Sequence, residues 1–477
     1  MFDLSKAYCF YFNEIAKIPH GSYNEEKISS YLEDFAKQRG LRYVRDPYNN
    51  IVIYKDGSKG YENASPLILQ GHMDMVCEAN KDVTFDFRND PLVLKTEGKW
   101  LMASGTTLGA DDGVAVAYML AILDNDSIAH PPLECCFTVQ EEVGLVGALK
   151  LDKDFFKAKR MICLDHGGEV DTCVSTSGGR RVLSTFKGRK ENNSAPAYRL
   201  FVSGLRGGHS GSLIHDNRAN ANKAATRIVK EMELQDIDIR IVLIDGGSKE
   251  NAIPRECEII FVSESDEERI MSLFSKLSED IRNEIIASEK DVSITLERMP
   301  ACPQCFDITF SKKMIDFLFL APNGFKEKSA LIEGLTITSL NLGVIKTEGD
   351  TISVMHSIRS VFASAKEELS EEVSLLSKIF GGTSTYNADY PGWNFAAESA
   401  LREKLKDALY KISGKELTTS AVHGGNECGV FSSFGVEDII SFGPIMEDIH
   451  TPKERLDLDS FDRCYNILLE ILKNCKD

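Results

Sequence analysis

Two histidines and several carboxylates lie next to short apolar runs at widely separated places in the chain. The run Pro66–Asp74, PLILQGHMD, ends in His72 and Asp74. Residues two apart on a strand point to the same side, so these two side chains can act together. Similar positions are held by Glu141 and Glu142 after LECCFTVQ, Asp165 after RMICL, His450 beyond DIISFG, and Asp111 at the start of GADDGVAVAYMLAIL.

These side chains are candidates for one metal site. In open α/β sheets, the loops that leave the carboxyl ends of parallel strands converge on a single crevice. Imidazole and carboxylate are good zinc ligands, and a carboxylate that bridges two ions lets both polarise one water. We therefore expect two metals bridged by Asp111. His72 and Asp165 would complete one, and Glu142 and His450 the other.

Two further carboxylates have different expected tasks. Asp74 can accept the second imidazole proton of His72 and fix its tautomer. Glu141 and Glu142 are adjacent, and neighbouring side chains diverge, so both cannot be ordinary ligands of one ion. Glu141 is therefore the candidate general base, which takes a proton from water and passes it to a leaving amine. Taken singly, each motif is better explained as a structural feature: HMD as a strand end, EE as a helix start and Asp165 as a loop cap. Together they indicate a catalytic constellation.

Composition limits the remaining possibilities. The 477 residues exceed the roughly 250 to 300 at which one hydrophobic core stops growing, so two domains are expected. A net charge of −18 disfavours partners such as nucleic acid or an anionic membrane surface. The opening MFDLSKAYCF does not have the pattern of a signal peptide. Twelve irregularly spaced cysteines indicate a cytoplasmic protein with reduced thiols, and Cys302 and Cys305 of CPQC are expected to be two thiols in a loop.

The order of predicted elements indicates an interrupted α/β domain. Helices are expected at residues 4–17 and 26–38, the second with Ser22 and Glu25 as a capping box. Strands alternate with helices up to about residue 185, which predicts a mainly parallel sheet flanked by helices. The polar segment GGRRVLSTFKGRKENNSAPA then breaks the pattern and is expected to be a boundary.

From Tyr198 the order changes to strand, helix, strand, strand, helix, strand, which is that of a ferredoxin-like unit. A partial second copy would follow, up to about residue 386. Because His450 is useful only if it reaches the crevice, the chain is expected to return to the first domain near residue 388. The prediction is a discontinuous catalytic domain, residues 1–186 and 389–477, with an inserted α+β lid at residues 187–388.

The motifs resemble those of the co-catalytic di-zinc peptidases, a family that includes carboxypeptidases, aminoacylases and dipeptidases. More narrowly, they are similar to those of the bacterial aminoacyl-histidine dipeptidases. The matching stretches cover essentially the whole chain: LQGHMDMVCE, GTTLGADDGVAVA, EEVGLVGA, GLRGGHSG, SLNLGVI, SIRS, YPGW, HGGNECGVF and GPIMEDIHTPKERL. The resemblance implies two Zn²⁺ per chain, with Mn²⁺ or Co²⁺ as possible substitutes. It implies the same five ligands, His72, Asp111, Glu142, Asp165 and His450, and the same roles for Asp74 and Glu141.

The resemblance also implies substrate-binding residues that the spacing alone does not identify. His209 of GGHSG is similar to a lid histidine that approaches the substrate carbonyl. Asn251 and Arg359 look like lid residues that hold the substrate backbone and its terminal carboxylate, although Arg359 could equally form a surface ion pair. Gly425 lies where a backbone contact to the substrate is possible, but a tight turn before a helix is the preferred explanation.

Two positions differ from the wider family. Gly113 stands where many relatives have lysine, which resembles the histidine-dipeptidase branch. The fourth ligand is Asp165 and not glutamate, which in the family accompanies aminopeptidase or dipeptidase activity. The expected function is therefore metal-dependent hydrolysis of dipeptides, with Xaa-His dipeptides preferred and a small peptide as the partner. A homodimer through the lid is possible. The alternatives are an aminoacylase or tripeptidase with the same machinery, or a non-catalytic binding protein that keeps the fold.

Overall fold

The computed structural model describes residues 2–332 and 335–477. The chain forms two compact units. Unit 1 consists of Met1–Thr176, Trp393–Ala421 and Asn426–Asp477, and unit 2 of Ser177–Gly392 and Val422–Gly425. Unit 2 is thus an insertion into a discontinuous unit 1, and its limits fall at residues 177 and 392 where the sequence predicted 187 and 388.

Unit 1 is built on a six-stranded sheet whose central strands are parallel. Strands β6, β3, β7 and β23 run parallel, and β1 and β2 extend the sheet antiparallel at the β6 edge. The order across the sheet is β1 (Arg42–Arg45), β2 (Ile51–Lys55), β6 (Leu133–Thr138), β3 (Leu67–His72), β7 (Arg160–Cys163) and β23 (Asp438–Ser441). Strands β3 and β6 are buried along their whole length, as strands covered on both faces must be.

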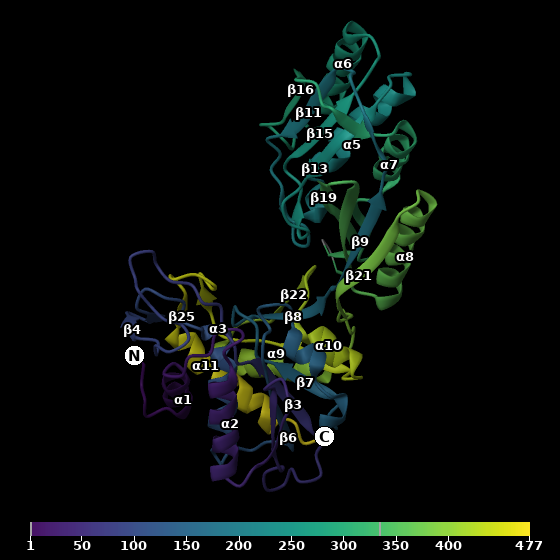
Figure 1. The fold of residues 1–477 in the computed structure, drawn as a ribbon. Helices are drawn as coiled ribbons and strands as arrows, with labels where there is room; N and C mark the ends of the chain where they lie inside the picture. The colour runs from purple at the N-terminus through teal and green to yellow at the C-terminus, as the bar shows by residue number, and fades with distance from the viewer. Residues whose placement is uncertain (1, 333–334) are drawn as a thin grey trace. The chain divides into compact units, whose positions relative to one another are not determined.

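Helices cover both faces of this sheet (Figure 1). Helix α3 is apolar all round and nearly every residue is buried, as expected of a helix enclosed by the core. It shares one hydrophobic cluster with α1, α2, α9 and α11, whereas α10 and α4 pack into a second cluster on the opposite face. The helices are α1 (Ala7–Ile15), α2 (Glu26–Gln38), α3 (Ala110–Leu123), α4 (Val146–Lys150), α9 (Ala400–Ser413), α10 (Glu427–Ser433) and α11 (Leu458–Lys473).

A small antiparallel sheet fixes the segment that carries His450. Its order is β24 (Met446–Glu447), β25 (Arg455–Asp457), β5 (Trp100–Ala103) and β4 (Leu94–Glu97). The loop with His450 connects β24 to β25, so both of its ends are held. Shorter pairs complete the fold: β10 (Lys190–Asn192) with β17 (Gln304–Phe306), β12 (Gly208–His209) with β14 (Ala252–Ile253), and β22 (Thr418–Val422) with β8 (Asp171–Thr176).

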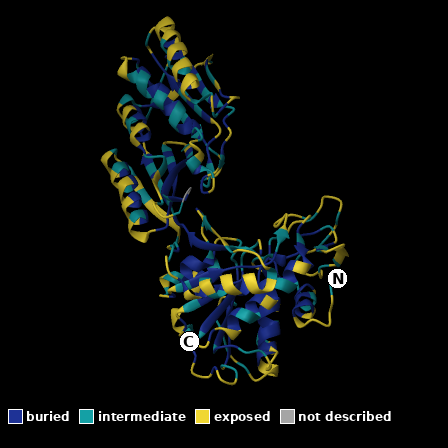
Figure 2. Ribbon diagram, turned by 180° about the vertical axis from the view of Figure 1, so that it is seen from behind, coloured by how far each residue is buried: buried dark blue, intermediate teal, exposed yellow. Residues whose placement is uncertain are grey.

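Unit 2 is one continuous antiparallel sheet with helices on one face. The order is β16 (Ser293–Met299), β11 (Ala197–Ser203), β15 (Cys257–Val262), β13 (Arg240–Gly246), β19 (Thr336–Glu348), β20 (Thr351–Ser360), β9 (Gly178–Lys187) and β21 (Thr383–Tyr390), and β18 (Gly324–Lys328) also pairs with β19. Helices α5 (Ala221–Leu234), α6 (Glu267–Ile285), α7 (Ile308–Leu320) and α8 (Ala363–Ile379) lie along the same face (Figure 1). Figure 2 shows that these helices expose their outer surfaces while the strands are mostly buried.

The ferredoxin-like prediction is confirmed for β11, α5, β13, β15, α6 and β16, which give the expected chain order and lie in the sheet order β16-β11-β15-β13. The helices and strands of the predicted second copy also form. However, β19, β20 and β21 join the sheet of the first copy, so they do not make a separate sheet.

The polar segment expected to be a boundary is a strand. Gly178–Lys187 forms β9, which lies between β20 and β21. Val182, Ser184 and Phe186 are buried on one side, and the residues between them are half-buried. The serine and the charged residues hid this period-two pattern in the sequence. The change from unit 1 to unit 2 falls just before this strand, between Thr176 and Ser177.

The predicted capping box at α2 does not form. The residue before the helix, Glu25, makes no side-chain cap, and its carboxylate accepts hydrogen bonds from Tyr23 N and Gln140 N. The Ser22 hydroxyl donates to Asp74 at 2.8 Å. Both side chains therefore form hydrogen bonds elsewhere and do not cap the helix.

Candidate metal centre

The central strands of unit 1 bring the predicted ligands to one edge of the sheet. His72 is the last residue of β3, Glu141 and Glu142 follow the end of β6, and Asp165 follows β7. Because β6, β3 and β7 are parallel neighbours, their carboxyl ends coincide. The convergence expected from the sequence is present.

Asp111 lies between the two imidazoles. Its Oδ1 is 3.1 Å from Nε2 of His72, and its Oδ2 is 3.1 Å from Nε2 of His450. Nε2 of His450 is also 2.8 Å from Oε1 of Glu142. One carboxylate that faces two separate groups of donors has the placement that a bridging ligand requires.

The orientation of His72 is set by Asp74. Nδ1 of His72 lies 2.9 Å from the backbone oxygen of Asp74 and 3.5 Å from its carboxylate. Nδ1 donates to that carbonyl, which leaves the lone pair of Nε2 for a ligand bond. The Asp74 carboxylate also accepts from Glu141 N at 3.0 Å and Ser22 Oγ at 2.8 Å. Asp74 therefore positions both His72 and the loop that carries the two glutamates.

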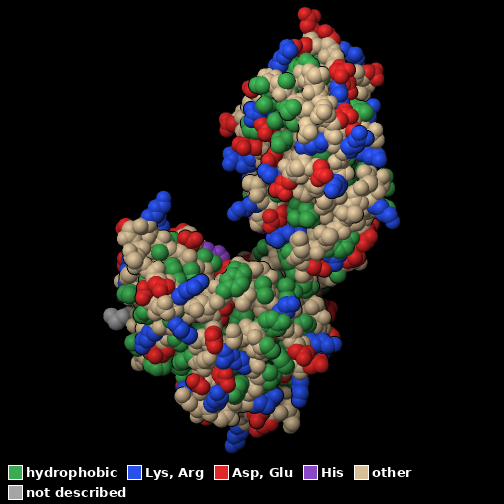
Figure 3. Space-filling model, viewed as in Figure 1, with side chains coloured by type: hydrophobic (Ala, Val, Ile, Leu, Met, Phe, Trp, Pro, Cys, Tyr) green, Lys and Arg blue, Asp and Glu red, His purple; other side chains and the backbone are tan. Residues whose placement is uncertain are grey.

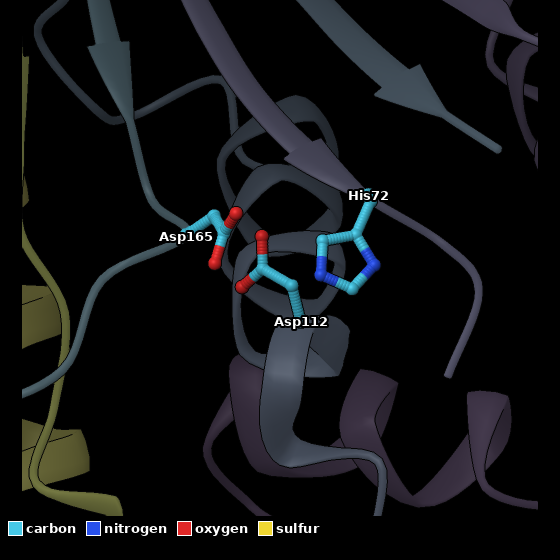
Figure 4. A group of neighbouring side chains, drawn as sticks. All are labelled: His72, Asp112 and Asp165. Carbon is cyan, nitrogen blue, oxygen red and sulfur yellow. The ribbon is translucent and has the colours of Figure 1, made fainter. Parts of the chain in front are cut away.

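Asp112 is a member of the cluster that the sequence did not single out. His72, Asp112 and Asp165 each offer a ligand atom within 4.8 Å of the others, and their side chains face one another (Figure 4). Asp112 is 1 % exposed, and its Oδ2 has no hydrogen-bond partner among the described residues. The only signal was the second aspartate of GADDG, next to the one chosen.

The donor set fits divalent cations. Three overlapping groups have their donor atoms within 4.8 Å of one another: His72 with Asp112 and Asp165, His72 with Glu141 and Glu142, and Asp111 with Glu142 and His450. All the donors are imidazole nitrogens or carboxylate oxygens, the ligands that zinc takes in catalytic sites.

The electrostatics of the cluster also favour a cation. Hydrogen bonds to Asp111 and then Glu142 raise the pKa of His450 to about 10. Burial, with the charge of Asp111 added, raises the pKa of Asp165 to about 6. Burial raises the pKa of Glu141 well above its ordinary value. Without metal the cluster retains protons, which a divalent ion would displace.

Two buried glutamates support the centre and were not predicted. The carboxylate of Glu454 accepts hydrogen bonds from the backbone N–H groups of Leu108 and Ala110, both at 2.8 Å, and so fixes the turn before Asp111. Glu427, at the start of α10, accepts from Thr138 Oγ1 at 2.7 Å and from Gln70. Both glutamates occur in motifs quoted above, but their spacing gave no indication of a role.

The four predicted substrate-binding residues all lie in unit 2. His209 of β12 pairs with Ala252 of β14, and Asn251 precedes that strand, with its backbone oxygen 2.8 Å from Ser210 N. Nδ1 of His209 accepts from Gly211 N at 3.3 Å and Ser212 N at 3.2 Å. The neutral ring therefore carries its proton on Nε2. Burial and the nearby charge of Arg359 lower the pKa of His209.

Arg359 and Gly425 meet at Tyr390. Arg359 is 7 % exposed, donates from Nη1 to the Tyr390 hydroxyl at 3.1 Å, and has no partner for Nε among the described residues. A Cβ at Gly425 would lie 2.4 Å from the Tyr390 ring, so only glycine fits there. His423 lies between the hydroxyls of Ser177 and Ser339, 2.6 and 2.7 Å away. Tyr390 and His423 were overlooked, although YPGW and HGGNECG contain them.

The class of protein defined by this sheet edge and these donors is a metal-dependent hydrolase. The chain belongs to peptidase family M20/M25/M40, whose model matches residues 68–474. The family resemblance found in the sequence is thus confirmed.

Individual relatives extend this match over nearly the whole chain. The cytosol non-specific dipeptidase of Escherichia coli (strain K12) is 32 % identical over 468 residues, which covers 97 % of this chain and 96 % of the relative. The crystal structure of aminoacylhistidine dipeptidase from Vibrio alginolyticus superimposes with a TM-score of 0.91 at 32 % identity, covering 98 % of this chain and 96 % of that one. Aminopeptidase PepT from Bacillus cereus ATCC 10987, at 16 % identity, full coverage of both chains and a TM-score of 0.59, shares the fold.

On the face seen in Figure 3, acidic and basic side chains are interspersed over both units. Within the described ranges, every helix is too short or too polar to cross a membrane. Cys302 and Cys305 are both free thiols, as the sequence predicted, but Cys305 lies in β17 and not in the expected loop.

Proposed function

We propose that the protein hydrolyses the peptide bond of unblocked dipeptides and prefers those with a C-terminal histidine. The observation that carries the proposal is the cluster of His72, Asp111, Glu142, Asp165 and His450 with Glu141 beside it, in a member of a peptidase family. The names of the two relatives at 32 % identity, a non-specific dipeptidase and an aminoacylhistidine dipeptidase, support the substrate class.

The five ligands would hold two Zn²⁺, for which Mn²⁺ or Co²⁺ could substitute. Such ions lower the pKa of a bound water and polarise the carbonyl under attack. Within the chain, Asp111 would face both ions, and Asp74 would keep Nε2 of His72 available through its contact to Nδ1. Asp112 contributes a further carboxylate close to His72 and Asp165.

Glu141 is the proposed general base and acid. Its backbone N–H is held at 3.0 Å by the Asp74 carboxylate. Burial raises its pKa, so it holds a proton readily once it has taken one from water. It would then transfer that proton to the amine released when the peptide bond breaks.

The residues of unit 2 would bind the substrate. Arg359 suits the C-terminal carboxylate because its planar group can donate two parallel hydrogen bonds and its Nε has no partner among the described residues. His209 would act as a neutral donor from Nε2 to the substrate carbonyl oxygen, where negative charge develops. Asn251 and the backbone of Gly425 would hold the rest of the substrate backbone.

The proposal includes the cellular setting. The protein would act in the cytoplasm, as the name of the E. coli relative states for that protein. Unit 2, which corresponds to the lid expected at residues 187–388, would also form a homodimer. The homodimer is supported by the sheet face of unit 2 opposite the helices, which carries the half-buried apolar side chains of Phe201 and Ile260. A solution mass of one chain by light scattering would remove the dimer from the proposal.

The decisive experiment compares substrates with zinc-loaded protein. The panel contains Xaa-His dipeptides, other dipeptides, a tripeptide and an acylated amino acid, each with a chelated control. Cleavage of free dipeptides, strongest with C-terminal histidine and lost on chelation, is expected. Equal rates on all dipeptides would retain the dipeptidase and reject the histidine preference. Cleavage of only the acylated substrate or the tripeptide would reject the dipeptidase while keeping the metal site.

A further inference from the structure

Glu289 is a buried carboxylate at the base of the segment that carries His209. It lies in the turn after α6 and is 0 % exposed. Its Oε2 accepts from Arg206 N at 2.7 Å, and its Oε1 accepts from Ala219 N at 3.0 Å. The two oxygens therefore hold the two ends of segment 206–219 together, and His209 lies within that segment.

The charge of Glu289 is balanced by backbone groups. None of the ion pairs found in the described part of the chain includes Glu289, and the groups that donate to its carboxylate are the backbone N–H groups of Arg206 and Ala219. Ala219 immediately precedes Asn220, the N-cap of α5, so the carboxylate also lies near the positive end of that helix. A buried charge is a poor source of stability, since its desolvation offsets most of the gain. The carboxylate instead fixes the positions of the two ends of segment 206–219 relative to each other.

Other contacts brace the same segment. Nη1 of Arg218 donates to the oxygen of Gly207 at 2.6 Å, and Nε of Arg255 donates to the oxygen of Leu205 at 3.0 Å. Within the described residues, the polar contacts of the His209 ring are those of Nδ1 with Gly211 and Ser212 of segment 206–219. The direction of Nε2 is therefore set by the conformation of the segment.

We propose that Glu289 is a positioning residue for His209, acting through the closed base of segment 206–219. The inference rests on the proposed function, because it assumes that His209 contacts the substrate. Glu289 itself would touch neither substrate nor metal. Its role would be to keep the Nε2 donor in the orientation that the developing negative charge requires.

The test is the variant Glu289→Gln, which keeps size but offers one acceptor and a donor that faces a backbone N–H. A 10- to 100-fold fall in kcat/KM with unchanged metal content is expected. Hydrogen exchange in residues 206–213 should become at least tenfold faster. The matched control is Glu134→Gln in unit 1, where a carboxylate, 5 % exposed, likewise accepts from two backbone groups, Lys157 N and Ala158 N. The control should keep kcat/KM within twofold.

A double variant separates positioning from a general structural role. In a His209→Ala background, Glu289→Gln should lower kcat/KM less than twofold, because the group it positions is already absent. The inference would be overturned if Glu289→Gln lowered kcat/KM as much in the His209→Ala background as in the original protein. It would also be overturned if Glu289→Gln alone changed neither hydrogen exchange nor activity. If His209→Ala alone kept full activity, the proposed role of His209 would fail, and the exchange data would still decide whether Glu289 closes the segment.

Discussion

Two imidazoles of unit 1, His72 and His450, and two of unit 2, His209 and His423, have opposite electrostatic surroundings. In unit 1, carboxylates face His72 and His450: burial would lower the pKa of His72, but hydrogen bonds to Asp111 and Asp74 raise it well above its ordinary value. In unit 2, His209 and His423 have no carboxylate partner among their described contacts. Burial and then the charge of Arg359 lower the pKa of both, that of His423 to about 3.

The difference separates two kinds of chemistry. His72 and His450 lie where positive charge is favoured, so they are suited to a site that binds cations. His209 and His423 stay neutral at physiological pH, so they can only donate or accept hydrogen bonds. Arg359 is the permanent positive charge that acts on both of these rings. A hydrolase needs both: charge to activate water, and fixed neutral donors to orient the substrate.

The largest effect is expected for Glu141→Gln, which tests whether Glu141 is the general base and Glu142 the metal ligand. The amide cannot take a proton, so kcat should fall about a thousandfold or more. The metal content should stay the same, because the five proposed ligands are unchanged. The measurement is kcat together with metal content by mass spectrometry. Glu142→Gln is the companion variant and should lose metal. If Glu141→Gln loses metal while Glu142→Gln keeps both ions, the two roles are reversed.

A smaller effect is expected for Arg359→Lys, which tests whether Arg359 in unit 2 binds the carboxylate of the substrate. Lysine keeps the charge but loses the planar pair of donors, so KM for a dipeptide should rise roughly 30- to 100-fold with little change in kcat. A dipeptide amide should show no such rise. Arg199→Lys, in β11 of the same unit, is the control and should leave KM unchanged. A loss of equal size for the amide would show that Arg359 does not bind the carboxylate.

The smallest effect concerns His356 of β20, which is fully buried with neither ring nitrogen hydrogen-bonded within the described structure. Burial, and then the charge of Lys223, lower its pKa to about 3. Above pH 6.5 the ring is neutral in both states and this group adds no pH dependence. As the pH falls below about 6.5 the unfolded state binds the proton first, so stability is lost, by about 2 kcal/mol at pH 5.

His356→Leu should remove that loss. The free energy of opening of β20, measured by hydrogen exchange at pH 7 and pH 5, should differ less in the variant than in the original protein. His215→Leu, at a ring that is 40 % exposed in the same unit, is the control and should keep the original difference. An unchanged difference in His356→Leu would show that the ring takes up a proton in the folded protein.

The candidate metal centre could be predicted because short stretches of sequence indicate its residues. His72, Glu142 and Asp165 each follow an apolar run, and a parallel sheet brings the ends of such runs together whatever lies between them. The sequence led to Asp111 and missed the contribution of Asp112, because both lie at the start of α3, where the backbone at both residues is not helical.

The contacts of unit 2 were not predictable in this way. His209, Asn251 and Arg359 came only from the family resemblance, since a histidine in a glycine-rich turn and a single arginine carry no spacing signal. Glu289 meets the segment of His209 through tertiary folding alone. Ser22 shows the same limit in unit 1: a correct local pattern for a helix cap was overridden by the distant Asp74.

The pairing of β23 with β7 and the contact of Glu454 with the turn before Asp111 have a consequence for protein synthesis. A ribosome makes β3, β6 and β7 early, then the whole of unit 2, and only afterwards β23, His450 and Glu454. Domains generally fold as units while the chain emerges. The nascent protein therefore has most of the carboxylates of the candidate site in place long before His450 is made, and the site can be complete only after that segment has left the ribosome.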